Sequence, residues 1–277
     1  MDFGSIEEYD KSNEFRVEEQ SVKNQIHYPV IEMKQIKKSF GYVHALNGMD
    51  FKAYQGEVTA IVGDNGSGKS TLIKILTGCL KPDSGEIRIK DETFSNLSVR
   101  QAIEQGITTV YQDLALDNCK DCAGNIFLGK ELMKWGIFLD HKKMRERTKE
   151  LLERLQIYIP DIRQPVEKMS GGQRQALAIA RAVHAGGDIM IFDEPTSAMG
   201  LKETSRIMNL FLELKKEGKT IILISHNLFQ VFDIADRICV INNGRFVDSF
   251  LTKDSSPEEL HRLIVEREEE LGDEKMV

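Results

Sequence analysis

The most informative segment of this chain is GDNGSGKST, residues 63–71. It matches the pattern G-x-x-x-x-G-K-[ST], and it lies between a β-branched segment, 57–62, and an amphipathic segment, 70–80. Glycines in such a loop let backbone N–H groups wrap an anion, and the following helix adds partial positive charge at its N-terminus. We therefore expect nucleotide phosphates to bind here. The predicted contact residues are Gly63, Asn65, Gly66, Ser67, Gly68, Lys69, Ser70 and Thr71.

A second pattern, IMIFDE at residues 189–194, places two carboxylates at the end of a buried apolar run. Asp193 fits the role of holding Mg²⁺ through water, together with the hydroxyl of Ser70. Glu194 is the candidate general base that polarises the attacking water. Lys69 is placed to reach the β- and γ-phosphates. The two patterns together predict that the chain binds ATP with Mg²⁺ and hydrolyses it.

Strand and helix signals alternate through most of the chain. Apolar runs at 188–193, 220–225 and 237–242 are typical of parallel strands that are buried on both faces. The segment 30–40 alternates apolar and polar residues, and we expect it to continue at 51–53 after a turn at Asn47–Gly48. Helices are predicted at 173–184 and 204–216, and the segment 128–157 reads as mostly helical. These signals predict an α/β domain with a mainly parallel sheet and a helical block, about 113–186, inserted in it.

The ends of the chain differ from its centre. Residues 1–29 are polar and weakly patterned, so we predict an N-terminal extension before a main domain at 30–250. Residues 251–277 are predicted to contain an acidic helix that begins near Ser256. The sequence lacks a signal peptide pattern and a long apolar run, so other subunits would have to bring the chain to a membrane.

Net charge and cysteine spacing disfavour a nucleic-acid partner and a zinc site. The net charge of −7 argues against nucleic acid, because neutralising phosphates needs a basic face. Cys119 and Cys122 form a lone C-x-x-C pair, and a zinc site would want a second pair or histidines at metal-ligand spacing. We read the four cysteines of the chain as reduced thiols.

A third pattern, MSGGQ at residues 169–173, comes directly before an alanine-rich helix. Ser170 and the two glycines at a helix start can cradle an anion. An ordinary helix cap made by Ser170 explains the same residues equally well. The pattern alone leaves these two readings open.

Taken together, and with MSGGQ preceding IMIFDE in the chain, the three patterns resemble the nucleotide-binding subunits of ABC transporters over roughly residues 30–250. The resemblance implies a P-loop NTPase (RecA-like) core with a mainly parallel sheet, an antiparallel β subdomain and an inserted α-helical subdomain. It also implies a head-to-tail homodimer with two ATP molecules at its interface. Ser170, Gly172 and Gln173 would then act in trans, on the γ-phosphate held by the other subunit. Met169 replaces the more usual leucine, which conserves volume.

Other positions match the family residue by residue. Phe40 matches the aromatic that stacks on adenine, with Tyr42 a weaker candidate, although Phe40 could also be a core aromatic at a strand end. Gln112 matches the glutamine that meets Mg²⁺ and links the sheet to the helical subdomain. His226 matches the histidine that contacts the γ-phosphate and orients water with Glu194. The implied catalytic residues are Lys69, Gln112, Glu194 and His226, and the implied Mg²⁺ ligands are Ser70, Gln112 and Asp193. Gly200 departs from the family pattern, where aspartate is frequent.

The segments YQDLAL, 111–116, and NIFLGKE, 125–131, resemble importers of monosaccharides of the ribose and fructose type. This resemblance implies sugar import through integral-membrane permease subunits, with a solute-binding protein as an indirect partner. The chain would be a peripheral subunit at the cytoplasmic side of the membrane. A soluble ABC-type ATPase that is not coupled to transport is the alternative, and it would favour a coiled-coil insertion, tandem cassettes or a basic face. An inactive cassette is disfavoured because the catalytic side chains are intact.

Overall fold

Six strands form the central sheet of the computed structural model, which describes residues 28–262 and 265–266. Their order is β12-β11-β3-β10-β9-β6, and every neighbouring pair from β11 to β6 is parallel. The strands are β3 (Val58–Val62), β6 (Ile107–Val110), β9 (Ile189–Asp193), β10 (Thr220–Ile224), β11 (Arg237–Asn242) and β12 (Arg245–Leu251). Only β12 runs antiparallel to its neighbour. The prediction of a mainly parallel core is confirmed.

The central sheet is buried on both faces, as its apolar runs predicted. Ile189 and Ile191 belong to an apolar cluster shared with α2 (Lys69–Leu76) and the second sheet, whereas Met190 and Phe192 belong to the cluster on the other face. There the ring of Phe192 lies 4.4 Å, centroid to centroid, from that of Phe211 on α7 (Leu201–Lys216). Two short helices, α3 (Val99–Glu104) and α8 (Leu228–Phe232), complete the core. Helix α2 ends at Leu76, earlier than the predicted limit of 80.

A second sheet is antiparallel, in the order β2-β1-β4-β5. Its strands are β1 (Pro29–Phe40), β2 (Val43–Tyr54), β4 (Ser84–Ile89) and β5 (Glu92–Phe94). The predicted turn at Asn47–Gly48 is wrong, because the chain reverses between Phe40 and Val43. Gly48, with φ of 75°, instead lies within β2 where the pairing slips by one residue. A glycine with left-handed backbone after an asparagine is compatible with a β-bulge as well as with a turn.

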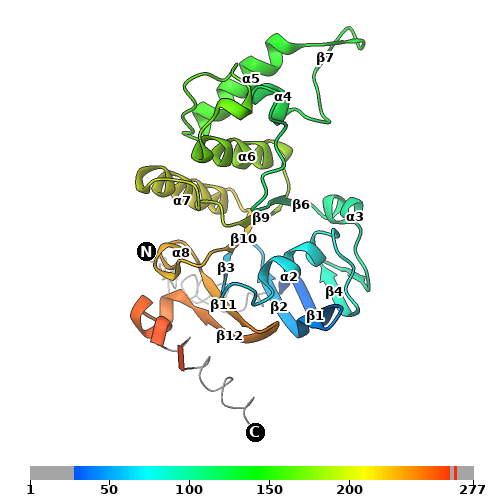
Figure 1. The fold of residues 1–277 in the computed structure, drawn as a ribbon, viewed down its shortest axis with the longest axis vertical. Helices are drawn as coiled ribbons and strands as arrows, with labels where there is room; N and C mark the ends of the chain where they lie inside the picture. The colour runs from blue at the N-terminus through cyan, green and yellow to red at the C-terminus, as the bar shows by residue number, and fades with distance from the viewer. Residues whose placement is uncertain (1–27, 263–264, 267–277) are drawn as a thin grey trace, which may run out of the picture.

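The helical subdomain occupies the segment between β6 and β9 and forms the upper part of the molecule in Figure 1. Its helices are α4 (Cys122–Ile126), α5 (His141–Arg154), the 3₁₀ turn η1 (Val166–Lys168) and α6 (Gly171–Ala185). The expectation that 128–157 is mostly helical is wrong for 133–139, where β7 (Met133–Lys134) and β8 (Phe138–Leu139) form a hairpin. Trp135 and Gly136 both have positive φ, which a right-handed helix excludes.

Each predicted terminal segment includes residues that lie outside the described part of the chain. The predicted N-terminal extension, residues 1–29, lies outside the described residues as far as residue 27. Within the predicted C-terminal segment, residues 257–262 and 265–266 are helical. Within the described part of the chain, no helix has the length and apolar character needed to cross a bilayer.

Glu32 on β1 is a buried carboxylate surrounded by cations. Its side chain is 10% exposed and lies 2.9 Å from Arg88 and 3.2 Å from both Lys34 and Lys52. Burial alone would raise the pKa of Glu32, but the hydrogen bonds from these three residues outweigh it and lower the pKa from 4.5 to about 2. The antiparallel sheet is therefore held together in part by one charge.

The lowered pKa of Glu32 predicts a specific acid sensitivity of the fold. The carboxylate stabilises the folded state fully above about pH 4.5, and this contribution is lost as the pH falls through 4.5 towards 2. We expect Glu32→Gln to lower the free energy of unfolding at pH 7 by on the order of 2–3 kcal/mol and to flatten its pH dependence below 4.5. Urea unfolding at several pH values measures both effects. Glu86→Gln, at an exposed position on β4, is the control. Equal pH slopes for parent and Glu32→Gln would contradict the prediction.

Candidate active site

An open cleft of about 380 Å³ lies where β3, β9 and β10 end. Because these strands are parallel neighbours, the loops that leave their carboxyl ends meet at one edge of the sheet (Figure 1). The cleft is lined by Ala45, Asn65, Gly66, Gly68, Lys69, Ser70, Thr71, Gln112, Asp193, Glu194, Ser197, Ile224 and His226. The structure thus brings together the glycine-rich loop, both carboxylates, the glutamine and the histidine that the sequence singled out.

The glycine-rich loop needs two of its glycines for steric reasons. Gly63 has φ of 148°, and a Cβ there would lie 2.0 Å from the carbonyl oxygen of Ile241. Gly68 has φ of 106°, and its Cβ would lie 2.8 Å from the carbonyl oxygen of Ala45. Gly68 is also the N-cap of α2, where no side chain caps the helix. The N–H groups of the first turn of α2 are thereby left to a ligand with negative charge.

Lys69 is buried at the base of the loop. Its Nζ donates hydrogen bonds of 2.7 Å to the carbonyl oxygens of both Gly63 and Asp64. Burial lowers the pKa of Lys69, although the nearby carboxylates of Glu194, Asp193 and Asp64 act in the opposite direction. The ammonium group of Lys69 therefore lies inside the glycine-rich loop, where a bound phosphate would be expected.

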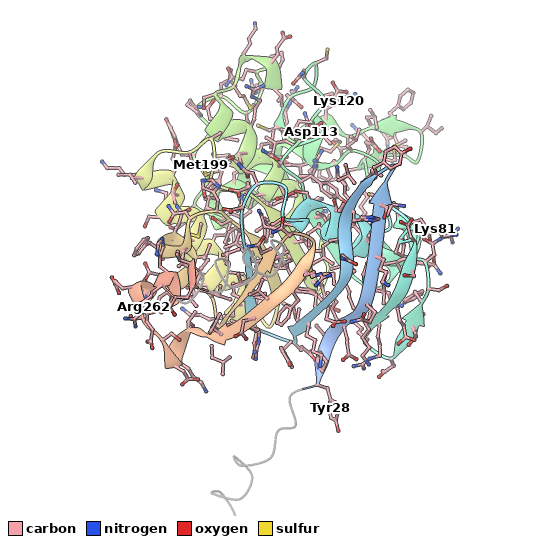
Figure 2. All side chains as sticks on the ribbon, turned by 60° about the horizontal axis from the view of Figure 1, so that its bottom comes forward. Tyr28, Lys81, Asp113, Lys120, Met199 and Arg262 are labelled. Carbon is pink, nitrogen blue, oxygen red and sulfur yellow. The ribbon has the colours of Figure 1, made fainter. Side chains whose placement is uncertain are left out.

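Ser70 and Asp193 bring two oxygen ligands together. The Ser70 hydroxyl donates to Oδ2 of Asp193 over 3.3 Å. Burial raises the pKa of Asp193 above its ordinary value, while the bond from Ser70 opposes that rise. Gln112, two residues after the end of β6, lines the same cleft, and Figure 2 labels its neighbour Asp113. A buried carboxylate with a hydroxyl beside it is a fitting place for a hard cation.

Glu194 is held in an unfavourable backbone conformation. Its φ is 53°, in the left-handed region that costs a non-glycine residue energy and that is common at functional sites. Its N–H donates to the carbonyl oxygen of Ile224 over 3.1 Å. The two carboxylate oxygens lie 2.9 and 3.0 Å from Nδ1 of His226. Carboxylate and imidazole therefore form one unit at the open side of the cleft.

Gln175 is a positioning residue that the sequence analysis missed. It lies buried on α6, its amide donates to the carbonyl oxygen of Glu194 over 2.6 Å, and its carbonyl oxygen accepts the N–H of Ala198 over 3.1 Å. One side chain thus ties the helical subdomain to the loop that carries Glu194. The sequence does contain an indication of this role. Gln175, three residues after Gly172, is a polar residue on the otherwise apolar face of an alanine-rich helix.

The SGGQ residues lie away from this cleft. The Ser170 hydroxyl accepts the N–H of Gln173 over 3.2 Å, and the Gln173 side chain accepts the N–H of Ser170 over 3.0 Å. This reciprocal pair is a capping box at the start of α6. Ser170, Gly172 and Gln173 do not line the cleft of their own chain, so their role across a dimer stays a prediction.

The aromatic candidates and Gly200 also lie outside the cleft lining. Phe40 ends β1 and is half-exposed, with Nζ of Lys38 at 5.7 Å from its ring centroid. Tyr42 is fully exposed at the adjoining turn. Adenine stacking on either ring stays a prediction. Gly200 is the N-cap of α7, and its N–H donates to Glu203 over 3.1 Å, so Glu203 completes the cap of this helix.

Solved structures with the same fold are nucleotide-binding cassettes. A nucleotide-free ATP-binding cassette from an ABC transporter superposes with a TM-score of 0.72 at 26% identity, covering 84% of this chain and 98% of that one. A dimeric post-hydrolysis state of an ATP-binding cassette, bound to ADP and phosphate, superposes with a TM-score of 0.71 at 26% identity, covering 80% and 98%.

Sequence relatives carry names from the same family. The xylose/arabinose import ATP-binding protein of Sulfolobus acidocaldarius is 43% identical over 231 residues, 83% of this chain and 92% of that protein. The fructose import ATP-binding protein of Rhizobium meliloti is 43% identical over 224 residues, 78% of this chain and 86% of that protein. The ribose import ATP-binding protein of Yersinia pestis is 39% identical over 241 residues, 86% of this chain but 47% of that protein.

A family model described as "ABC transporter" matches residues 46–197, which include the glycine-rich loop, the SGGQ segment and the two carboxylates. The predicted family resemblance is confirmed by this match and by relatives at 43% identity. This chain belongs to the ABC transporter ATP-binding family and is a nucleotide-binding ATPase of that family.

Proposed function

We propose that this chain is the ATP-hydrolysing subunit of a sugar importer and works as a dimer beneath a permease, at the cytoplasmic side of the membrane. One observation carries the ATPase chemistry: Lys69, the Ser70–Asp193 pair and the Glu194–His226 pair all face one cleft. The names of relatives that import xylose, arabinose, fructose and ribose support sugar as the class of solute. A solute-binding protein is an indirect partner in this proposal.

The phosphates of ATP are held, in this proposal, by the loop and the first turn of α2. Lys69 exchanges the carbonyl oxygens of Gly63 and Asp64 for β- and γ-phosphate oxygens, which compensate its charge better. Ser70, Asp193 and Gln112 hold Mg²⁺, because their hydroxyl, carboxylate and amide oxygens are ligands that this cation accepts. The ion, when bound, neutralises charge on the phosphate oxygens.

Glu194 and His226 carry out the proton transfer in this proposal. A water molecule attacks the γ-phosphorus, the bond to the bridging oxygen of ADP breaks, and the Glu194 carboxylate takes the proton of the water. His226 holds that carboxylate at 2.9–3.0 Å and is free on its exposed side to contact the γ-phosphate. Gln175 keeps the backbone of Glu194 in place during this step.

The second half of each site comes from the other subunit in this proposal. Ser170, Gly172 and Gln173 stand at the N-terminus of the 15-residue helix α6, where N–H groups and the helix dipole favour an anion. They lie outside the cleft of their own chain. A head-to-tail partner would bring them to the γ-phosphate, and the dimeric cassette bound to ADP and phosphate supports such an assembly.

Glu194→Gln tests the base assignment. The amide keeps the size of the side chain but cannot accept the proton, so we expect hydrolysis to fall at least about 100-fold. ATP binding should survive, because the glycine-rich loop and Lys69 are unchanged. Phosphate release measures the first effect, and the rise in melting temperature on adding ATP measures the second.

The control for this experiment is Glu217→Gln, an exposed carboxyl at the end of α7 that should leave the ATPase rate unchanged. Hydrolysis by Glu194→Gln at the parent rate would overturn the assignment of Glu194 as base. Loss of the ATP-induced rise in melting temperature would show instead that the substitution damages nucleotide binding.

Affinity purification from detergent-solubilised membranes tests the link to transport. We expect the tagged chain to retain multi-span membrane proteins and to hydrolyse ATP faster with them than alone. Sugar added with its binding protein should raise the rate of this complex further. A chain that purifies without membrane subunits and reaches full activity alone would favour a soluble ATPase that is not coupled to transport.

A further inference from the structure

The hairpin tip, residues 133–139, exposes an unusual set of apolar side chains. Trp135 is 81% exposed and Ile137 is 74% exposed. Met133, Phe138 and Leu139 are also exposed. Figure 1 shows the hairpin of β7 projecting from the upper end of the molecule, beyond α4 and α5. A contiguous exposed stretch of this kind marks an interaction site more often than a random surface does.

The backbone of the hairpin tip gives a second, independent observation. The turn is closed by a hydrogen bond of 3.3 Å from the N–H of Ile137 to the carbonyl oxygen of Lys134. Its two central residues, Trp135 and Gly136, have φ of 55° and 73°. Such turns favour asparagine, aspartate or glycine at both central positions, and a bulky aromatic there is a strained exception. The backbone at this position disfavours tryptophan, so Trp135 does not stabilise the turn. Its presence indicates a functional contact instead.

The charges around the hairpin tip indicate the chemistry of its partner. Residues 128–149 contain seven lysines and arginines against three acidic residues, although the whole chain has a net charge of −7. Four exposed lysines lie on or beside the hairpin: Lys130 just before it, Lys134 on it, and Lys142 and Lys143 in the first turn of α5. The ammonium of Lys134 also lies 4.8 Å from the centroid of the Trp135 ring. Aromatic and aliphatic side chains flanked by lysines are suited to the boundary between anionic headgroups and acyl chains.

We propose that the hairpin tip inserts into the headgroup region of an anionic phospholipid bilayer. Trp135 and Ile137 enter the boundary with the acyl chains, and the surrounding lysines contact lipid phosphates. The contact would hold the helical subdomain against the membrane surface without any spanning segment. It goes beyond the transport role proposed above, and the isolated chain suffices to test it, so the failure of one proposal leaves the other standing.

The fluorescence of Trp135 offers a direct test, because it is the single tryptophan of the chain. We expect vesicles with phosphatidylglycerol to shift its emission to shorter wavelength, and vesicles of phosphatidylcholine alone to do so far less. Lipids brominated on the upper part of their acyl chains should quench the emission. Contact of Trp135 with another protein would not cause this quenching. Added salt should weaken the effect, because it screens the lysines.

Variants separate lipid contact from folding. Trp135→Asn places a favoured residue in the turn, so the protein should melt at the same or a higher temperature, yet its co-sedimentation with anionic vesicles should weaken about tenfold. Ile137→Ser should weaken co-sedimentation as well. Ile103→Ser is the matched control, since Ile103 is 64% exposed on α3, and it should bind vesicles like the parent. The ATPase rate in the absence of lipid should be the same in all three variants.

Four results would overturn the proposal. The emission of Trp135 could stay unshifted with anionic vesicles, or Trp135→Asn could co-sediment as well as the parent. A shift that depends on protein concentration and needs no vesicles would assign the hairpin tip to contact between copies of the chain instead. A shift that requires co-purified membrane subunits and resists brominated lipids would assign it to a protein partner.

Discussion

The parallel pairing of β3, β10 and β9 is the constraint on which the rest of the site depends. In this register Ile224 stands opposite Ile61 on one side and opposite Asp193 on the other. The glycine-rich loop therefore starts at the same level of the sheet as Glu194 and His226, although the three segments are far apart in the sequence. A slip of one residue would turn each strand's side chains to the other face, and two apolar clusters oppose that slip.

The backbone conformation of Glu194 is energetically unfavourable, and hydrogen bonds from neighbouring residues stabilise it. Glu194 has a backbone conformation that costs on the order of 1–3 kcal/mol. Its carbonyl oxygen accepts from Gln175 and from the hydroxyl of Ser197, and its N–H donates to Ile224. Because Gln175 belongs to α6, a movement of the helical subdomain would displace the backbone of Glu194. Helix α6, which begins with SGGQ, is thus linked through Gln175 to Glu194 in the cleft of its own chain.

The sequence predicted the parts of the fold whose signals are local. The loop at 63–71, the buried strands and the capped start of α6 follow from residue spacing and apolar runs. Other parts depend on contacts between distant residues and were missed. The Asn47–Gly48 pair makes a bulge because β1 pairs beside it, the hairpin at 133–139 interrupts a segment with good helix formers, and Gln175 finds its partners only across a loop. A bulge, a strained turn and a buried amide have weak signals within a short window.

In the proposed dimer a second copy of the chain completes each ATP site, and complementation between two inactive variants tests this arrangement. Lys69→Ala removes the lysine proposed to bind phosphate, and Ser170→Arg blocks the start of α6, so each variant alone should hydrolyse almost no ATP. Mixed dimers would contain one site with both Lys69 and Ser170 intact, so we expect that mixing the two proteins restores part of the parent rate. A mixture that stays as inactive as its components, although mixed dimers form, would contradict it.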